Sequence, residues 1–328
     1  METALRPMTT SQVLDRTFFL YRQNFLLFLG LALVGPGLTL MASLAQLAFF
    51  GPPVMPDPGN FEPAVFQSFL MRAIVGGLVG IVVYTVGQAL ASSATVHAVS
   101  MVHLGKTTSI VESYRKIVPI LWRIIGVFLR VILIAWSPIF AAYMLMIVAA
   151  LGVSVLLRSA GGGAAGGAVI VIVLLGLLGI FGGIVWAVFA YCRYGLAVPA
   201  CTVEGLEPRY ALMRSKFLTR GSLLRILGIF LLTLVMGWIL TSVLQIPAFF
   251  FANPFAMKPG AVSLAYLFWA QLGSFLGQTL AGPIATIAIA LVYYDERVRK
   301  EAFDLQLLIQ SIEPAAQTQA AGFTPIGS

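Results

Sequence analysis

The sequence predicts an all-α membrane protein with six transmembrane helices, arranged as three hairpins that are each preceded by a cytoplasmic amphipathic helix. Hydrophobic residues make up 59% of the chain and charged residues only 10%, whereas a soluble domain carries about 25% charged residues. Six uncharged runs reach the ~20 apolar residues that span a bilayer as a helix. A nine-residue pattern also recurs at the start of three predicted spans, which indicates an internal repeat.

The first predicted span is a retained helix and not a cleaved signal peptide. Its apolar run begins only at Phe25, and Gly35-Pro36-Gly37 stands in its middle, with no small-residue cleavage site near its end. We expect one domain, residues 1–312, followed by a flexible cytoplasmic tail at residues 313–328. The six spans cover residues 25–50, 73–101, 121–157, 168–192, 223–252 and 261–294.

The recurring pattern directly follows a predicted amphipathic segment in each of its three copies. It reads LWRIIGVFL at Leu121–Leu129 and LLRILGIFL at Leu223–Leu231, and FLLFLGLAL at Phe25–Leu33 is a weaker copy. Anchored on their central glycines, the copies lie 96 and 102 residues apart. The repeat therefore predicts that each hairpin begins in the same way.

Amphipathic helices are predicted on the side of the membrane where these copies begin. In the first, Leu14, Phe18, Tyr21 and Phe25 recur at helical spacing and the charged residues fall off this stripe. The second starts with Ser-Ile-Val-Glu, a capping-box pattern. We expect these helices to lie in the headgroup layer, with the stripe toward lipid and Arg toward phosphate. The four segments are residues 10–24, 109–120, 208–222 and 296–312.

The distribution of Lys and Arg predicts how the chain is oriented. Most of these residues lie in the N-terminal arm, in the second and fourth connections and after the last span. Positive residues concentrate in the cytoplasmic segments of membrane proteins. We therefore expect a multi-pass protein of the prokaryotic cytoplasmic (inner) membrane with both termini in the cytoplasm.

Small residues and prolines indicate how the spans pack. A GxxxG pair occurs in the second span of each hairpin, which favours close helix contact, so we expect the second, fourth and sixth spans to pack at the centre. Prolines inside spans kink helices. Such kinks are either accommodated by packed neighbours or used to build transporter sites. The pairs are Gly76/Gly80, Gly179/Gly183 and Gly273/Gly277, and the prolines are Pro36, Pro138, Pro247 and Pro283.

The sequence contains no pattern typical of catalysis or of cofactor binding. None of the uncharged runs contains Asp or Glu, and the common nucleotide-binding, zinc-peptidase and serine-hydrolase motifs are missing. His97 and His103 have no carboxylate beside them in the sequence, which favours packing or interfacial roles. We expect a protein that is not an enzyme and that uses no cofactor or metal.

Arg130 is the one charged residue whose position in the sequence does not fit the membrane–water interface. It lies nine residues beyond Leu121, about 13 Å along a helix. Its side chain either extends back to the cytoplasmic headgroups, forms a structural pair, or binds an anionic group inside the bundle.

The cytoplasmic face carries the densest polar chemistry. Its charges either set the topology and attract anionic lipid, or form a docking surface for a soluble protein, which the mixed signs at residues 295–304 favour. We expect no nucleic acid as a partner. The candidate lipid or partner contacts, besides Arg130, are Arg193, Glu204, Arg214, Asp295, Arg297 and Arg299.

Three segments carry a resemblance to a known family: VLDRTFFLYRQNFLLFLG at Val13–Gly30, EGLEPRYALMRSKFLTRG at Glu204–Gly221 and LVYYDERVRKEAFDLQLL at Leu291–Leu308. They resemble the membrane-domain family of bacterial glycerophosphoryl diester phosphodiesterases, which are multi-helix prokaryotic membrane proteins. In some relatives this membrane domain precedes a soluble phosphodiesterase barrel. Only 34 residues follow Tyr294 here, so the resemblance implies the membrane part alone and carries over no catalytic residue.

Two functions of different classes fit these observations. We expect foremost a non-enzymatic scaffold, anchor or accessory subunit that presents basic cytoplasmic helices to anionic lipid or to a soluble partner. The alternative is a carrier or binding protein for a lipid or small amphiphile, with the proline-kinked helices and Arg130 as its site. A carrier predicts an internal polar cavity that reaches Arg130, whereas a scaffold predicts a filled bundle and an exposed cytoplasmic patch.

Overall fold

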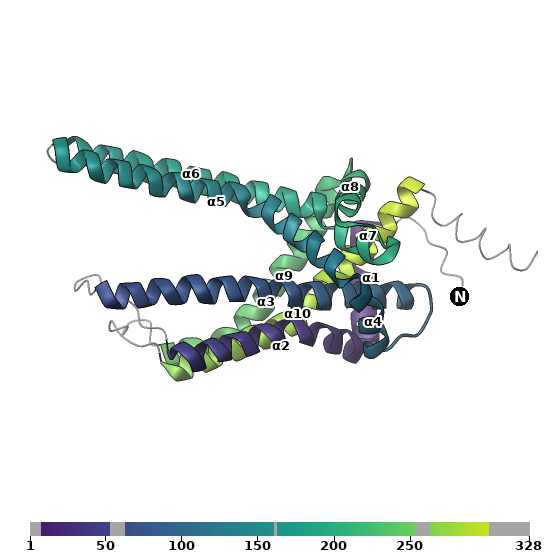
Figure 1. The fold of residues 1–328 in the computed structure, drawn as a ribbon. Helices are drawn as coiled ribbons and strands as arrows, with labels where there is room; N and C mark the ends of the chain where they lie inside the picture. Colours follow the sequence, from purple (N-terminus) through teal and green to yellow (C-terminus); the bar gives the residue numbers. More distant parts are fainter. Residues whose placement is uncertain (1–7, 53–62, 161–162, 253–262, 302–328) are drawn as a thin grey trace, which may run out of the picture.

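The computed structural model describes residues 8–52, 63–160, 163–252 and 263–301, and these residues form helices and no strands. Six helices are long and apolar enough to cross a membrane, as predicted (Figure 1). These are α2 (Phe25–Phe50), α3 (Pro63–His103), α5 (Leu121–Ala160), α6 (Gly163–Tyr194), α9 (Leu223–Ala252) and α10 (Leu264–Glu301). The shorter elements are α1 (Thr10–Gln23), α4 (Ile110–Ile117), the 3-10 turn η1 (Val118–Ile120), α7 (Ala197–Glu204) and α8 (Pro208–Thr219).

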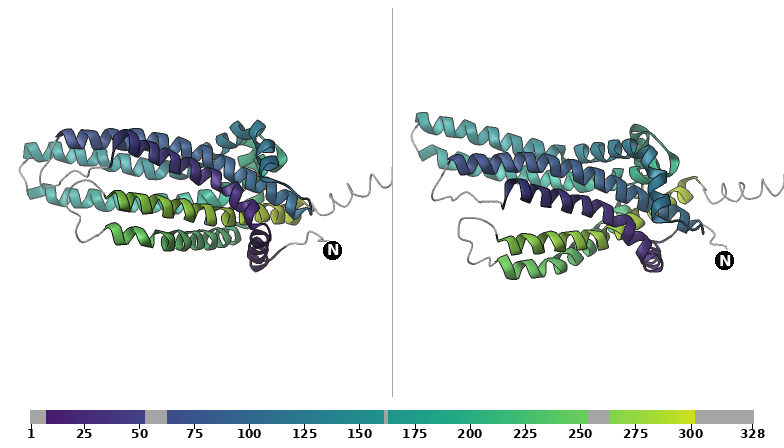
Figure 2. Two further views of the ribbon diagram at one scale, coloured as in Figure 1. Left: turned by 90° about the horizontal axis from the view of Figure 1, so that it is seen from below. Right: turned by 60° about the horizontal axis from the view of Figure 1, so that its bottom comes forward.

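The long helices lie side by side in sequential pairs, and the short helices gather at one end of them (Figure 1). Helix α2 packs along α3, α5 along α6 and α9 along α10, and the other views agree (Figure 2). Helix α10 also contacts α1, α2 and α3, so it lies at the centre of the bundle. Helices α5 and α6 diverge from the other long helices toward the end that lacks the short ones (Figure 1).

The long helices expose large apolar side chains along their length. Leu78, Leu178 and Trp238 are 63%, 67% and 69% exposed. In the most apolar window of each helix, only 11% to 44% of the residues are buried inside the protein. Soluble proteins rarely expose contiguous apolar surfaces of this size. The surface is therefore that of a multi-pass membrane protein, for which lipid is the solvent.

Two long helices extend past the predicted span limits because their charged residues are bonded locally and do not end the helix. Helix α3 runs through Arg72, whose guanidinium donates to the carbonyls of Phe50, Gly51 and Pro52 at the end of α2. Helix α10 runs without a break through Asp295, where the sixth span and the fourth amphipathic segment were expected to separate. The rest of that segment and the expected tail at residues 313–328 lie outside the described residues.

The predicted central meeting of the second, fourth and sixth spans is wrong. Helix α6 packs chiefly against α5, α8 and α9, and it lies at the edge of the bundle. Its Gly183 faces Ile139 of α5, and Gly277 of α10 faces Thr241 of α9. The small residues thus allow close approach within a sequential pair, while α10 meets α2 and α3 through other contacts.

The short helix α1 forms where predicted but packs with a different face. A capping box starts it, in which Gln12 N–H donates to Thr9 Oγ1 at 3.3 Å and Thr9 N–H donates to Gln12 Oε1 at 2.8 Å. The buried residues are Val13, Thr17, Leu20 and Tyr21, whereas Leu14 and Phe18 of the expected stripe are only half-buried. Helix α1 is therefore docked on α10 by a face that shares only Tyr21 with that stripe, and the Tyr21 hydroxyl donates to the carbonyl of Leu280 in α10.

The recurring nine-residue pattern marks the first residues of α2, α5 and α9. In two copies, the central glycine packs closely against the first residue of a later short helix, α4 or α8. A Cβ on Gly30 would clash with Ile110 of α4, and one on Gly126 would lie 3.0 Å from Pro208 Cγ of α8. Gly228, in the third copy, has no such neighbour within 4 Å among the described residues.

The glycine contacts give a first prediction. In Gly277→Ala the new Cβ would lie 2.8 Å from Thr241 Cα, so α9 and α10 must separate, and we expect a loss of about 1–3 kcal/mol of unfolding free energy. Gly80→Ala is the matched control, because a Cβ there meets nothing within 4 Å. Denaturant titration in detergent micelles measures both. Equal stability of the two variants would contradict the tight α9–α10 contact.

Candidate functional site

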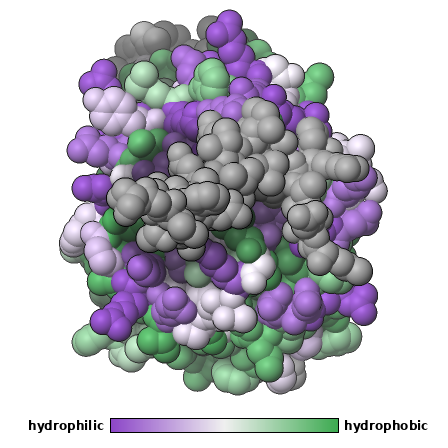
Figure 3. All heavy atoms as spheres, turned by 90° about the vertical axis from the view of Figure 1, so that its right-hand side faces the viewer, coloured by the Kyte–Doolittle hydropathy of each residue, from purple (hydrophilic) through white to green (hydrophobic). Residues whose placement is uncertain are grey.

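Hydrophilic residues gather at the end of the bundle that holds the short helices (Figure 3). The last turns of α10, DERVRKE at Asp295–Glu301, position most of the charges that interact there. Every residue from Ala290 to Glu296 is buried, so other elements surround α10 at this depth. We call the linked charges the ion-pair network; its members are Glu204, Arg214, Arg225, Asp295, Glu296, Arg297, Arg299, Lys300 and Glu301.

Arg214 of α8 joins α7 to the end of α10. Its Nε donates to both carboxylate oxygens of Glu204, at 3.1 and 3.0 Å, and its Nη2 donates to Glu301 Oε2 at 2.7 Å. Tyr293 donates its hydroxyl hydrogen to Glu204, and Arg297 lies 3.7 Å from the same carboxylate. The hydrogen bond that Arg214 donates to Glu301, reinforced by the charge of Glu204, raises the pKa of Arg214 despite its partial burial. This guanidinium is therefore a permanent cation between two carboxylates.

Asp295 clamps the start of the described chain to α9 and α10. Its carboxylate is fully buried and accepts from Arg225 Nη1 at 2.6 Å and from Arg299 Nε at 2.8 Å. The backbone N–H of Met8 donates to its other oxygen at 2.5 Å. The carbonyl of Met8 in turn accepts from Arg225 Nη2 at 2.8 Å and from Arg299 Nη2 at 2.5 Å. One buried carboxylate thereby fixes the chain segment that leads into α1.

Lys300 caps the C-terminal end of α8. Its Nζ donates to the carbonyls of Phe217, Leu218 and Arg220, the last at 2.7 Å, and it lies 3.6 Å from Glu296. The carbonyls at a helix end have no partner within the helix and favour a nearby cation. Lys300 therefore ties the α8 C-terminus to α10.

Five of the seven predicted contact residues meet in this network: Glu204, Arg214, Asp295, Arg297 and Arg299. They bind one another and the backbone of the same chain. The charges at residues 295–301 are thus largely paired within the chain, and the docking surface expected at residues 295–304 stays a prediction. Helical spacing indicates the pairs within α10, but it could not reveal the partners from α7, α8 and α9.

Arg193 and Arg130 lie apart from the network. The carbonyl of Arg193 accepts from Ser215 Oγ at 2.8 Å, and its guanidinium lies 5.6 Å from the centre of the Phe189 ring. Arg130 is exposed on α5 and donates to the carbonyl of Gly126, one turn toward the start of that helix, at 3.1 Å. Its direction fits a side chain that extends back to the headgroups, and it does not place Arg130 inside the bundle.

A polar cavity beside two prolines has no counterpart in the sequence predictions. Pro36 and Pro283 line a space of about 30 Å³ between α2, α3 and α10. Gln88 and Gln278 line it as well, and neither side chain has a hydrogen-bond partner among the described residues. The space fits about one water molecule. Glutamines inside otherwise apolar spans are the signal that a search limited to ionisable residues overlooks.

The described part of the chain holds no group of three or more His, Cys, Asp or Glu side chains placed to bind a metal ion. Comparisons with models of protein families, with curated proteins and with solved structures found no match to this chain. Of the three segments quoted for the family resemblance, those that hold α8 and the end of α10 meet in the network, and the segment that holds α1 packs on α10. The geometry there joins helices and presents no reactive pair of side chains.

The network gives a second prediction. In Arg225→Met, the buried Asp295 and Glu296 lose a shared cation, and we expect a loss of roughly 2–3 kcal/mol of unfolding free energy, since breaking a buried pair leaves uncompensated charge. Arg209→Met removes the same charge from an exposed position without an ion pair among the described residues and should change stability by less than 0.5 kcal/mol or so. Thermal unfolding of both variants in the same detergent compares their stabilities. A similar loss of stability in the two variants would contradict the proposed role of Arg225.

Proposed function

We propose that the chain is a non-enzymatic integral protein of a prokaryotic inner membrane that acts as a scaffold or anchor and rests a layer of short helices on anionic headgroups. In this arrangement three hairpins, α2–α3, α5–α6 and α9–α10, cross the bilayer. The amphipathic helices α1, α4 and α8 precede them on the cytoplasmic side, where both termini also lie. The clustering of Lys and Arg near the short helices supports this orientation.

The outer face of α8 is the observation that carries the proposal. Its inner face is locked to the bundle by Arg214 and Lys300. On its outer face, three apolar or aromatic side chains are more than half exposed. Basic residues that form no ion pair among the described residues lie beside them. Apolar and basic residues together are typical of helices that lie in the headgroup layer. The apolar residues are Tyr210, Met213 and Phe217, and the basic ones are Arg209, Lys216 and Arg220.

Lipid fits this face better than the soluble partner considered from the sequence. The mixed-sign segment that favoured a protein partner is engaged within the chain, whereas the charges of α8 itself that form no ion pair among the described residues are basic. Each basic residue near an anionic surface contributes about 1 kcal/mol of attraction. Membership of the glycerophosphoryl diester phosphodiesterase membrane-domain family remains part of this proposal, supported by the meeting of the three resembling segments.

The alternative of a carrier that uses Arg130 and the kinked helices has less support. Arg130 lies on the outside of α5, whereas Pro36 and Pro283 line a cavity between α2, α3 and α10. That cavity of about 30 Å³ is too small for an amphiphile. These parts do not form one site in the described chain.

The depth of α8 in the bilayer tests the proposal directly. Nitroxide labels at Met213→Cys and Phe217→Cys, in a background that lacks the buried Cys192 and Cys201, should be more accessible to oxygen than to a water-soluble nickel chelate. A label at Lys216→Cys is the control on the same helix and should be reached by the chelate. If all three labels are equally open to the chelate, α8 projects into water and its outer face instead fits a soluble protein.

The free basic residues of α8 give a further prediction. In nanodiscs, anionic lipid should raise the unfolding temperature of the wild-type protein above its value in zwitterionic lipid. Arg209→Gln/Lys216→Gln/Arg220→Gln should lose most of this gain, about 3 kcal/mol in all, and should match the wild type in zwitterionic discs. An unchanged gain in the triple variant would count against headgroup binding by α8.

A further inference from the structure

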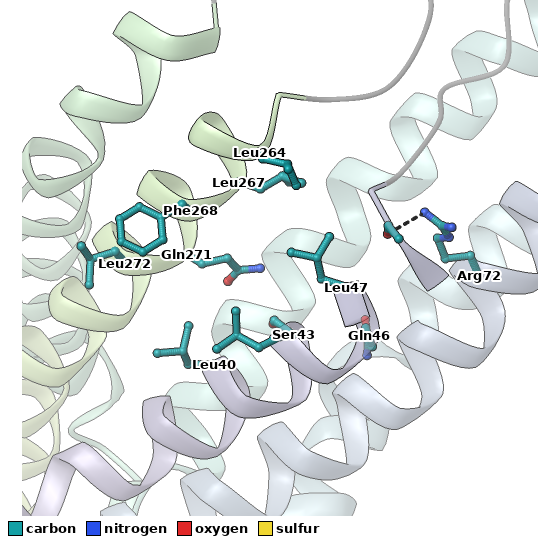
Figure 4. Close-up of a pocket in the computed structure, with 12 residues that line it drawn as sticks. Leu40, Ser43, Gln46, Leu47, Arg72, Leu264, Leu267, Phe268, Gln271 and Leu272 are labelled. Atoms are coloured by element: carbon teal, nitrogen blue, oxygen red, sulfur yellow. Dashed lines mark hydrogen bonds between the residues drawn. The ribbon is translucent and has the colours of Figure 1, made fainter. Parts of the chain in front are cut away.

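At the end of the bundle away from the ion-pair network, α2 and α10 leave a lateral crevice of about 350 Å³ (Figure 4). Its walls are apolar: Leu40 and Leu47 come from α2, and Leu267 and Phe268 come from α10. Phe268 is also 60% exposed, so the crevice opens on the side that lipid covers. Its volume lies in the range of small-molecule sites, about 300–1,000 Å³.

Ser43 and Gln46 also line this crevice, but each donates to a backbone carbonyl, of Thr39 and of Gly76. Gln271 is the uncharged polar side chain there that makes no such bond. Its amide points into the space between α10 and α2 (Figure 4) and has no hydrogen-bond partner among the described residues. Gln271 lies about 10 Å along α10 from the first residue of that helix, and Leu264, Leu267 and Leu272 line the crevice beside it. A polar group in such apolar surroundings is costly unless something bonds to it. The amide therefore indicates a ligand with a polar group inside the apolar region.

Arg72 marks the rim of the same crevice with a positive charge. Its guanidinium is held in place because Nη1 donates to the carbonyls of Gly51, at 3.2 Å, and Pro52, at 2.7 Å, at the end of α2. No carboxylate among the described residues pairs with it, and its Nε–H makes none of these bonds. A fixed, unpaired cation at the end of an apolar crevice complements an anionic headgroup.

We propose that the crevice binds an anionic two-chain phospholipid from the leaflet opposite the ion-pair network. One acyl chain lies between α2 and α10, the amide of Gln271 bonds an ester oxygen, and the guanidinium of Arg72 pairs with the phosphate. The apolar walls select a lipid over a free phosphate, and the charge at the rim selects an anionic headgroup over a zwitterionic one. This site lies at the other end of the molecule from the outer face of α8 and does not depend on it.

Native mass spectrometry tests the site, with the full chain equilibrated in equal amounts of phosphatidylglycerol and phosphatidylcholine. The wild type should retain phosphatidylglycerol preferentially, and Arg72→Gln should lower the retained ratio about tenfold, the factor that ~1.4 kcal/mol sets. Arg72→Lys keeps the charge and should restore most of the preference. The control Arg115→Gln removes an exposed arginine from α4, in the proposed headgroup layer at the other end of the bundle, and should lower the ratio much less than Arg72→Gln does.

Gln271→Leu is the second variant, because Arg72 also holds the end of α2 whereas the Gln271 side chain bonds to nothing in the described chain. It should fold normally and retain less of both lipids. The proposal is overturned if the wild type retains the two lipids equally, or if folded Arg72→Gln and Gln271→Leu retain as much phosphatidylglycerol as the wild type. An equal drop in Arg115→Gln would also overturn it, since it would place the bound lipid at the other end.

Discussion

Asp295 and Glu296 bring two carboxylates into the interior of the protein, at the end of its central helix. An isolated charge in such a place carries a desolvation penalty of several kcal/mol, which only close cations and hydrogen bonds offset. Arg225, Arg299 and Lys300 supply them, and all three cations also bind backbone carbonyls of other segments. These two buried carboxylates must be neutralised. This requirement therefore fixes the positions of the N-terminal segment, the start of α9 and the end of α8.

The two ends of the bundle are stabilised by different forces. At the charged end, ion pairs and hydrogen bonds join α7, α8, α9 and the segment before α1 to α10. Toward the other end, contacts between α5 and α6 are made by small and aliphatic side chains, and this pair diverges from the rest (Figure 1). Since lipid is as apolar as these side chains, burial against a neighbouring helix gains little there. The bundle is consequently tight where charges meet and open where lipid fills in.

The sequence predicted those parts of the fold that depend on local pattern. The limits of α2 and α9 agree with apolar runs that end at Pro- or Gly-containing connections. The limits of α3 and α10 did not, because Arg72 and Asp295 were taken to end a span although tertiary partners keep each within a helix. Helix α7 was missed, since its eight residues, AVPACTVE, have no amphipathic period.

The candidate site was predicted in composition but not in its pairing. Charge density directed attention to Glu204, Arg214 and Asp295, yet whether such charges face a partner or one another is decided by long-range contacts. Gln271 and Gln88 carried no signal in a search for ionisable groups, because an amide is significant only where the fold leaves it unbonded in an apolar wall. Local pattern thus located the polar regions, and only the assembled helices showed which polar groups remain free.

The central place of α10 bears on the order in which the protein can mature during synthesis. The ribosome makes Met8, Glu204, Arg214 and Arg225 before any of their α10 partners exists. Earlier helices can already associate through close contacts such as Gly30 with Ile110 and Gly126 with Pro208. The ion pairs to Asp295, Glu296 and Glu301, however, cannot form until α10 has been made. Completion of the chain is thereby coupled to closure of the fold, and a nascent chain halted before α10 lacks the central helix that holds the others together.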